Sequence, residues 1–536
     1  MNVLMLYPKF PEQTFWNTVR SVKLLWGRKA IMPPLGLLTI AGYLPEDFSV
    51  RLVDRNIADE SSSDWEWADV VFLSVMMAQQ NDYLECVANA KIHGKPIAVG
   101  GPFTHALPEA ACADADWVCF GEAENIMERL VSDLRADRRG KQYQGGSATN
   151  MEIVKIPSFE LLSNVNDYAT MALQFSRGCP FNCEFCDIIE IYGRVPRTKT
   201  PAQVCAELAT LERLGFQGYI FLVDDNFIGN KRKAKGMLAE LASWNRRQNY
   251  PFRYYTEASI NLADDDELLE RMFQAGFFQV FIGIETPDPR LLKTTQKMQN
   301  IPGNLLSKLA RIRRHGIHIT AGFIVGFDGE ERGVFEAQRT FIQTSGIGAA
   351  MVGLLQALPG TQLSRRLKAE GRLLEGLSST GNHTVEGINF IPRGEMTKRE
   401  YLENYRELVQ EIYQPKAYFG RTLPALLDLK ARAPLVAVRR HGAKLLVVLL
   451  KEAYHFGIRA KKIRFYFWKA FFQILWKRPG ALESFVFDCA IFHHLHEHAD
   501  YVQRELANYL SAPAPDDVLD CVVDSTRIPQ FNLRAG

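Results

Sequence analysis

Short apolar runs alternate with helical patterns over the first 140 residues of the chain. Strand-like runs lie at residues 3–8, 50–56, 69–75, 95–101 and 116–122. Between them, residues 35–44 and 81–94 place apolar side chains at helical spacing. Strands that alternate with helices indicate an α/β fold with a parallel, doubly wound sheet, whose ligand lies at the carboxyl ends of the strands.

A second β/α series follows a polar, Gly-rich segment, which we interpret as a linker at residues 141–164. Its six strand-like runs lie at residues 171–178, 218–225, 252–260, 278–285, 318–327 and 349–360. Six such units favour a partial (β/α)6 barrel, because a closed eight-stranded barrel usually needs about 250 residues. The sequence therefore predicts a doubly wound domain at 1–140, a barrel at 165–395 and a helical region at 396–536.

Composition and charge add one feature to this picture. With 47% hydrophobic and 23% charged residues, the chain has the composition of an ordinary folded protein, and its net charge of +2 gives no argument for nucleic acid as a partner. Residues 421–478, however, hold 14 Lys or Arg against only Asp428 and Glu452. Within them, residues 445–478 interleave aromatic and basic side chains, as in helices that lie on anionic membranes. The alternative is a helix that packs on the barrel by its apolar side.

The expected location follows from the N-terminus and the cysteines. The opening run MNVLMLYPKF reads as a strand rather than a signal peptide, and no stretch has the roughly 18 apolar residues of a membrane span. Three of the nine cysteines lie within eight residues, which favours a reducing compartment and a metal site over disulfides. We therefore expect a cytoplasmic protein that contacts the inner membrane peripherally through residues 421–478.

The cysteine cluster RGCPFNCEFC is the strongest chemical signal in the chain. It separates Cys179, Cys183 and Cys186 by three and then two residues. Thiolates suit zinc or iron–sulfur centres, but a structural zinc site needs four ligands, and Cys205 lies about twenty residues further on. Three thiolates can instead hold three irons of a [4Fe–4S] cubane and leave the fourth open. The loop follows the first predicted barrel strand, where active sites lie. A three-cysteine zinc loop is the alternative.

This spacing, with an aromatic residue before the third cysteine, resembles the radical S-adenosylmethionine superfamily. The resemblance implies that the cluster cleaves S-adenosylmethionine into a carbon radical and that Phe185 packs against the adenine. Other positions that match the family pattern are Asp225 and Asn226 in VDDN, Glu257 and Ser259 in TEAS, and Gly283 and Glu285 in FIGIE. The family places these positions near the methionine amino group, the ribose and the adenine, respectively. Turn or surface roles are the alternative, particularly for Asp225, Asn226 and Glu257.

The N-terminal region has no Gly-x-Gly-x-x-Gly motif or P-loop after a strand. The pairs Gly100–Gly101 and Gly121–Glu122 resemble instead the strand ends of the Rossmann-like, cobalamin-binding domains of a radical S-adenosylmethionine subgroup. Small residues there let the backbone approach a broad macrocycle, although plain turn glycines are the alternative. The loop after the first strand lacks the cobalt-ligating His of many cobalamin proteins, so the resemblance implies cobalt without a protein His ligand.

The resemblance covers residues 1–395, and residues 389–401 and 412–421 resemble the subgroup that includes the hopanoid C-2 methylase. It implies a cobalamin-dependent methyltransferase that acts on an unactivated carbon of a hopanoid or other lipid, with a flavodoxin or ferredoxin as electron donor. Two alternatives stay open: an oxidative cyclase or another radical enzyme without methyl transfer, and a non-catalytic iron–sulfur or cobalamin redox sensor.

A further group consists of four histidines: His493, His494, His496 and His498. Of these, His494 and His498 could share a metal or simply line a polar helical face.

Overall fold

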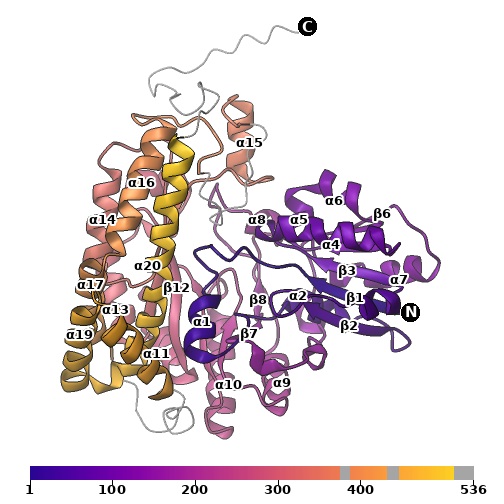
Figure 1. The fold of residues 1–536 in the computed structure, drawn as a ribbon, viewed down its shortest axis with the longest axis horizontal. Coiled ribbons are helices and arrows are strands. Elements are labelled where there is room, and N and C mark those ends of the chain that lie inside the picture. The colour runs from indigo at the N-terminus through magenta and orange to yellow at the C-terminus, as the bar shows by residue number, and fades with distance from the viewer. Residues whose placement is uncertain (375–386, 431–445, 512–536) are drawn as a thin grey trace.

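The first 144 residues form a parallel sheet of six strands in the order β2-β1-β3-β4-β5-β6 in the computed structural model, which describes residues 1–374, 387–430 and 446–511 (Figure 1). The strands are β1 (Asn2–Tyr7), β2 (Ser49–Asp54), β3 (Val70–Ser74), β4 (Ile97–Gly100), β5 (Trp117–Phe120) and β6 (Lys141–Gln144). The chain order reverses at β1, between β2 and β3. The carboxyl ends of β1 and β3 are therefore the topological switch point, where ligands bind in such sheets.

Helices cover both faces of this first sheet, which confirms the predicted doubly wound fold. They are α2 (Leu35–Ala41), α3 (Ser62–Trp67), α4 (Gln80–Ile92), α5 (Pro102–Ala106), α6 (Pro108–Asp114) and α7 (Met127–Arg135). Leu4 and Leu6 of β1 pack under α3–α6, whereas Val3 and Met5 face α2 and α7. Because both faces are buried, the strands read as continuous apolar runs. Strand β6 is the exception: only Tyr143 of its four residues is buried, so the pattern indicated a linker there.

The second sheet also has six parallel strands, in the order β14-β13-β12-β11-β10-β7. They are β7 (Thr170–Leu173), β10 (Tyr219–Leu222), β11 (Arg253–Ala258), β12 (Phe277–Glu285), β13 (His318–Val325) and β14 (Ala350–Leu354). The helices of this region are α8 (Ile188–Ile191), α9 (Pro201–Arg213), α10 (Lys231–Arg247), α11 (Asp266–Ala275), α12 (Pro289–Thr294), α13 (Leu305–Arg314), α14 (Val334–Ser345) and α15 (Gln362–Ala369). Within the described residues the edge strands β7 and β14 do not pair, as expected for a partial barrel.

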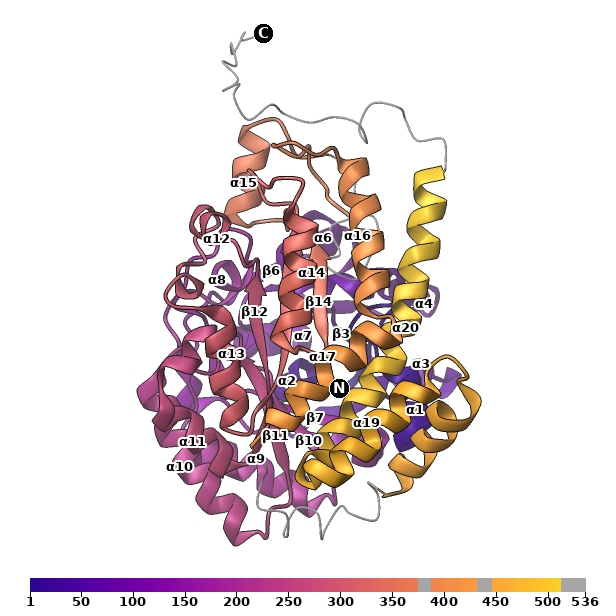
Figure 2. The ribbon, with the colours of Figure 1, turned by 90° about the vertical axis from the view of Figure 1, so that its left-hand side faces the viewer.

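The C-terminal region is helical, as predicted, over the residues that the structure describes. It comprises α16 (Lys398–Ile412), α17 (Pro415–Asp428), a helix over residues 446–454 with a π-helical continuation (His455–Arg459), α19 (Arg464–Lys477) and α20 (Leu482–Ser511). Helix α20 lies beside α16 and beside α1 (Val19–Trp26) (Figures 1 and 2). Within the basic segment 421–478, residues 431–445 lie outside the described residues. No helix in the described ranges has the length and apolarity that a bilayer crossing requires.

Two buried ion pairs join the first domain to the barrel. Both oxygens of Glu122 accept from Arg197, at 2.5 and 2.8 Å, and both oxygens of Glu124 accept from Arg177, at 2.6 and 3.1 Å. The Glu122 side chain is fully buried and that of Arg197 is 17% exposed. Arg177 and Arg197 lie on β8 (Ser176–Arg177) and β9 (Arg197–Thr198), the short antiparallel pair that flanks the cysteine loop. The domain interface therefore depends on paired charges placed directly beside that loop.

We expect the substitution Arg197→Met to destabilise the protein by about 3–5 kcal/mol, because it removes both short hydrogen bonds to the buried Glu122 carboxylate and leaves only Arg177 Nη1, 3.9 Å away, as a cation. Arg213→Met is the matched control, since Arg213 pairs with Glu160 on the surface and such pairs contribute only about 0–1 kcal/mol. Thermal unfolding and limited proteolysis of the two variants measure the difference. Equal transitions for both variants would contradict a stabilising role for the interface pair.

Candidate active site

The cysteine loop begins at the carboxyl end of the barrel, immediately after β7 and β8. Gly178 has a φ of +90°, and a Cβ there would lie 3.0 Å from the carbonyl oxygens of Gly193 and Val195, so only glycine fits the turn. The Gly178 amide donates to Asp225 Oδ2 at 3.1 Å, and the Cys179 amide donates to the Gly193 carbonyl at 3.3 Å. The first contact holds the cysteine loop against the loop that follows β10, and the second holds it against the segment between α8 and β9.

The three thiols lie close enough to influence one another's ionisation. Burial raises the pKa values of Cys179 and Cys186, and neighbouring thiols raise them further. Amide groups are directed at two of the sulfurs: Asn226 Nδ2 lies 3.9 Å from Cys179 Sγ, and Gln299 Nε2 lies 3.6 Å from Cys183 Sγ. Such donors stabilise negative charge on a thiolate or on a cluster sulfur.

This donor set fits a [4Fe–4S] cluster with three protein ligands. Within the described ranges, no three His, Cys, Asp or Glu side chains converge on a point that a single metal ion could occupy. The thiolates of a cubane each hold a different iron, so such convergence is not required of Cys179, Cys183 and Cys186. Soft sulfur ligands and amide donors to the sulfurs are the chemistry that iron–sulfur clusters use.

Phe185 lies in the loop between Cys183 and Cys186, and it packs against Phe327 of the IVGF run after β13. Their ring centroids are 5.8 Å apart, and Lys297 Nζ lies 5.9 Å from the Phe185 centroid. The structure therefore brings the aromatic residue of the cysteine motif and the end of β13 into one apolar wall beside the thiols.

Asn226 links the loops after β10 and β11. Its side chain donates from Nδ2 to Ser259 Oγ at 3.2 Å and accepts from the Ser259 amide at 3.2 Å, and Ser259 Oγ donates to Asn261 Oδ1 at 2.6 Å. Asn226 and Ser259 are buried. The two sequence motifs VDDN and TEAS thus form one hydrogen-bonded network next to Cys179.

Carboxyl groups gather at the same end of the barrel. Burial is the main reason that the pKa of Asp225 is raised to about 6 and that of Glu257 to about 7, and the Asp225 carboxylate contributes to the shift of Glu257. Buried carboxylates of this kind are stabilised by a cation. A sulfonium ligand with an α-ammonium group, such as S-adenosylmethionine, carries that charge, so these residues fit it.

Gly283 and Glu285 form a strained end of β12. Glu285 has a φ of +62°, and the pairing with β13 shifts register between these two residues. The Glu285 carboxylate pairs with Lys297, and a Cβ on Gly283 would lie 2.3 Å from Glu285 Oε1 and 2.7 Å from Lys297 Nζ. Glycine at this position therefore leaves room for the ion pair.

Sequence reasoning did not identify Lys297 and Gln299, which lie near the thiols in the structure. Both belong to the segment around a short 3₁₀ helix (Met298–Asn300) after α12. Burial opposes the charged form of Lys297, but the Glu285 carboxylate, and after it the Cys183 and Cys186 thiols, raise the pKa of Lys297 above its usual value. The run KTTQKMQN reads as an ordinary polar helix end, so it carries no signal of this role.

The N-terminal candidate residues have partners within the protein. A Cβ on Gly101 (φ +96°) would lie 2.7 Å from the Val75 carbonyl, and one on Gly121 (φ +72°) would lie 2.6 Å from the Gly146 carbonyl. A Cβ on Gly100 would make an ordinary contact, 3.6 Å from Cys119 Cβ. Glu122 pairs with Arg197 as described above. These contacts favour turn roles for Gly101 and Gly121 and an interface role for Glu122.

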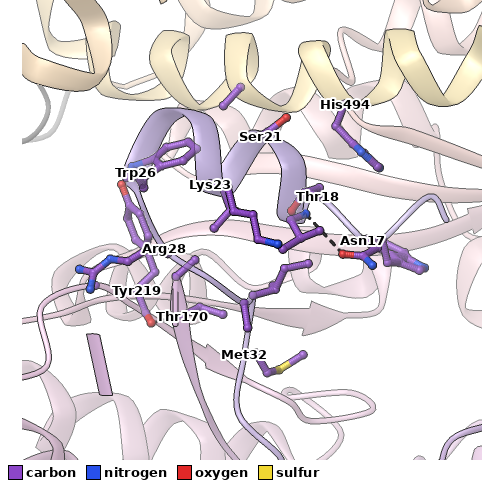
Figure 3. A pocket seen from close by; sticks show the side chains of 18 of the residues that line it. Asn17, Thr18, Ser21, Lys23, Trp26, Arg28, Met32, Thr170, Tyr219 and His494 are labelled. Carbon is purple, nitrogen blue, oxygen red and sulfur yellow. Dashed lines mark hydrogen bonds between the residues drawn. The ribbon is translucent and has the colours of Figure 1, made fainter. Parts of the chain in front are cut away.

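A cavity of about 1470 Å³ lies between the two sheets, α1 and α20 (Figure 3). Residues after β1, β2 and β3, including Lys9, Asn56 and Met76, line one end, which is the switch point of the first sheet. Side chains of the barrel strands line another part: Tyr219, Phe221, Tyr255, Glu257, Phe278 and Phe281. The volume exceeds the roughly 300–1,000 Å³ of a typical small-molecule site. The switch-point end fits a cobalamin, which α/β domains hold at such strand ends.

The His group of α20 makes contacts of its own. His494 shares a hydrogen bond of 2.8 Å with the Phe15 carbonyl, His496 shares one of 3.1 Å with the Tyr413 carbonyl, and His498 packs edge-on against Phe15. Burial lowers the pKa of His493 to about 4 and that of His498 to about 3, so both are neutral at pH 7. These contacts favour packing roles over a shared metal.

Comparisons with known proteins agree with this arrangement. Residues 26–131 match the B12 binding domain, residues 173–337 match the Radical SAM superfamily, and residues 361–508 match a domain of unknown function, DUF4070. An uncharacterized methyltransferase of Synechocystis is 40% identical over 98% of both chains, and the hopanoid C-2 methylase of Rhodopseudomonas palustris is 32% identical over 94% of this chain and 95% of its own. The cobalamin-dependent S-adenosylmethionine radical enzyme OxsB shares the fold, with a TM-score of 0.58 and 15% identity over 97% of this chain and 82% of that one.

The chain therefore belongs to the B12-binding radical S-adenosylmethionine family. Within that family it is a cobalamin-dependent methyltransferase, and its cofactors are a [4Fe–4S] cluster, S-adenosylmethionine and cobalamin.

We expect Cys183→Ala to lower the iron content of the anaerobically reconstituted protein well below the roughly four irons per chain of an intact cluster. Cys205→Ala is the matched control, because Cys205 lies on α9 and should leave the iron content unchanged. Iron and sulfide analysis with the visible absorption spectrum measures the outcome. Equal iron in the two variants would exclude Cys183 as a ligand.

Proposed function

We propose that this enzyme methylates an unactivated carbon of an apolar, elongated lipid of the hopanoid class. The observation that carries the proposal is the single cavity that joins the switch point of the first sheet to the interior of the barrel. A methyl donor held at the first sheet and a substrate held in the barrel would then share one chamber, which Glu257 of the proposed S-adenosylmethionine site also lines.

The shape of the cavity supports an elongated substrate. Arg253 and Glu257, near opposite ends of β11, both line it, and a strand rises about 3.3 Å per residue, so the cavity runs at least roughly 13 Å along the barrel. Phe221 and Tyr255 stack face to face on its wall, with ring centroids 4.6 Å apart. Aromatic walls of this kind favour an apolar ligand and exclude water, which a reactive radical requires.

Each group of residues has a proposed role. Cys179, Cys183 and Cys186 would hold the cluster. The S-adenosylmethionine site would comprise Phe185, Asp225, Asn226, Glu257, Ser259, Gly283 and Glu285. The loops after β1–β3, with the turns at Gly100, Gly101, Gly121 and Glu122 as support, would hold cobalamin. When bound, the cluster and S-adenosylmethionine would supply a carbon radical, and cobalamin would supply a transferable methyl group. The protein orients the two ligands, neutralises the sulfonium charge through Asp225 and Glu257, and keeps water out.

The hopanoid assignment is supported by the relative that bears that name, which matches this chain almost from end to end. An electron donor of the flavodoxin or ferredoxin class would supply the electron for cleavage. The proposed division of the chain is a cobalamin-binding domain at 1–140, a linker at 141–164, the barrel at 165–395 and a helical domain at 396–536, although β6 continues the first sheet to Gln144.

We expect methyl-labelled S-adenosylmethionine, cobalamin and a reductant to transfer label into a hopanoid, with formation of deoxyadenosine. Cys186→Ala should form neither product. Mass spectrometry of the extracted lipid and chromatography of the nucleosides measure both. Deoxyadenosine without labelled lipid would instead support a reaction without transfer to this substrate class, as in the cyclase alternative, and the absence of both would support the redox sensor.

We also expect Ala349→Phe to lower kcat/KM for the lipid on the order of 10- to 100-fold, because Ala349 lines the cavity and a larger side chain would displace the substrate. Deoxyadenosine formation without lipid should persist, since the residues proposed for S-adenosylmethionine are untouched. The exposed residue Ala136 gives the control Ala136→Phe, and thermal unfolding checks that both variants fold. An unchanged kcat/KM in a folded Ala349→Phe variant would place the substrate elsewhere.

A further inference from the structure

An exposed apolar surface covers the helices between residues 446 and 476. We call it the C-terminal apolar face; it comprises Leu446, Val447, Leu450, Tyr454, Ile458, Phe465, Phe472, Leu475 and Trp476. Trp476 is 88% exposed and Phe465 is 68% exposed. Single exposed apolar residues are ordinary, but a contiguous group of large ones marks a binding surface.

The face is one side of two amphipathic helices. Leu446, Leu450, Tyr454 and Ile458 recur every four residues, and Phe465, Phe472 and Trp476 follow at intervals of seven and four, which align on one side of a helix. Other side chains of the same segments are buried in the protein: Val448, Phe456, Phe467, Ala470 and Ile474. One side of these helices therefore packs against the rest of the protein. The exposed aromatic residues lie on the other side and are not part of that core.

Basic side chains lie on the same segments as the face. Residues 446–478 include Lys451, Arg459, Lys461, Lys462, Arg464, Lys469, Lys477 and Arg478. The only acidic residue in this range is Glu452, which is buried, and burial raises its pKa well above the usual value. Lys469 lines a shallow hollow with Phe465 and Phe472. Positive charge and aromatic surface thus occupy the same patch, which complements an anionic lipid surface.

The face is continuous with the mouth of the cavity. Val447 is half exposed and also lines the cavity, and Lys451 Nζ donates to the carbonyls of Leu24 and Leu25 at 3.2 and 3.1 Å, which ties this helix to α1. Leu24 of α1, which is 43% exposed, lies at this contact. Helix α19 lies at the end of the molecule opposite α15 (Figures 1 and 2).

We infer that the C-terminal apolar face docks the enzyme on an anionic membrane, with the mouth of the cavity beside Val447 turned toward the bilayer. Aromatic and aliphatic side chains enter the interfacial region, and the lysines and arginines contact anionic headgroups. A lipid can then pass from the bilayer into the cavity without crossing water. A second copy of the chain is a poorer occupant of the face, because two strongly basic surfaces repel each other.

The test is flotation of the full-length holoenzyme with vesicles of phosphatidylcholine alone or with phosphatidylglycerol. We expect it to float with the anionic vesicles and to be released by high salt, which screens the headgroup charge. Lys461→Glu/Lys462→Glu and Phe472→Ser/Trp476→Ser should each weaken binding at least about tenfold. Flotation measures membrane binding, whereas the methylation assay measures product formation. A failure of the methylation assay would therefore leave the flotation result unaffected.

Matched controls remove the same kinds of side chain elsewhere. Arg246→Glu/Arg247→Glu reverses two exposed charges on α10, and Ile92→Ser/Ile153→Ser removes two residues that are 77% and 74% exposed. Both controls should bind like the unaltered enzyme. Equal flotation of face and control variants, equal binding to neutral and anionic vesicles, or no flotation at all would each overturn the inference. So would a dimer that Phe472→Ser/Trp476→Ser converts to a monomer.

Discussion

The arrangement of the active site depends on the buried charges that join the first domain to the barrel. Glu122 and Glu124 follow β5 of the first sheet, and their partners Arg177 and Arg197 flank the cysteine loop. Burial alone would raise the pKa of Glu124, but the Arg177 guanidinium holds it below its usual value, so the pair stays ionised. A buried charge without its partner is strongly destabilising. The geometry of the pairs therefore fixes the position of the cobalamin-binding sheet relative to the cluster loop.

A second constraint is the accumulation of acid at the carboxyl end of the barrel. Asp225 and Glu257 are costly to ionise in a buried site, and Lys297 already pairs with Glu285. Under the proposed function, a cationic sulfonium ligand would lower that cost, so the same buried carboxylates would favour its binding. The amides of Asn226 and Gln299 complete the pattern, because they face the sulfurs and stabilise negative charge on the other side of the site.

The sequence predicted the layers of the fold because its strands are apolar runs that are buried on both faces. The missed strand β6 buries only Tyr143 and pairs by its backbone, which leaves no hydrophobic pattern. The cysteine spacing indicated the cluster because three ligands lie in one loop. Glu122 and Arg197, however, are 75 positions apart, and Lys297 lies over a hundred residues after Cys186, so only the folded chain brings them together. Gly101 and Gly121 have close backbone contacts that require glycine whether or not the domain holds cobalamin, so the glycines alone do not distinguish a turn from a cofactor site.

The position of the first domain also constrains how a substrate reaches the barrel. Its loops contact the cysteine loop through Arg177 and Arg197, and His105 lies against Gly360 after β14, so the domain covers the carboxyl end of the second sheet at two separate strands. The cavity extends the other way, past Tyr219 and Arg253 at the amino ends of β10 and β11, toward α1 and Val447. In the proposed function, entry from that side would let an elongated apolar molecule lie along the barrel with one end toward the carboxyl ends of the strands, while the first domain covers those ends.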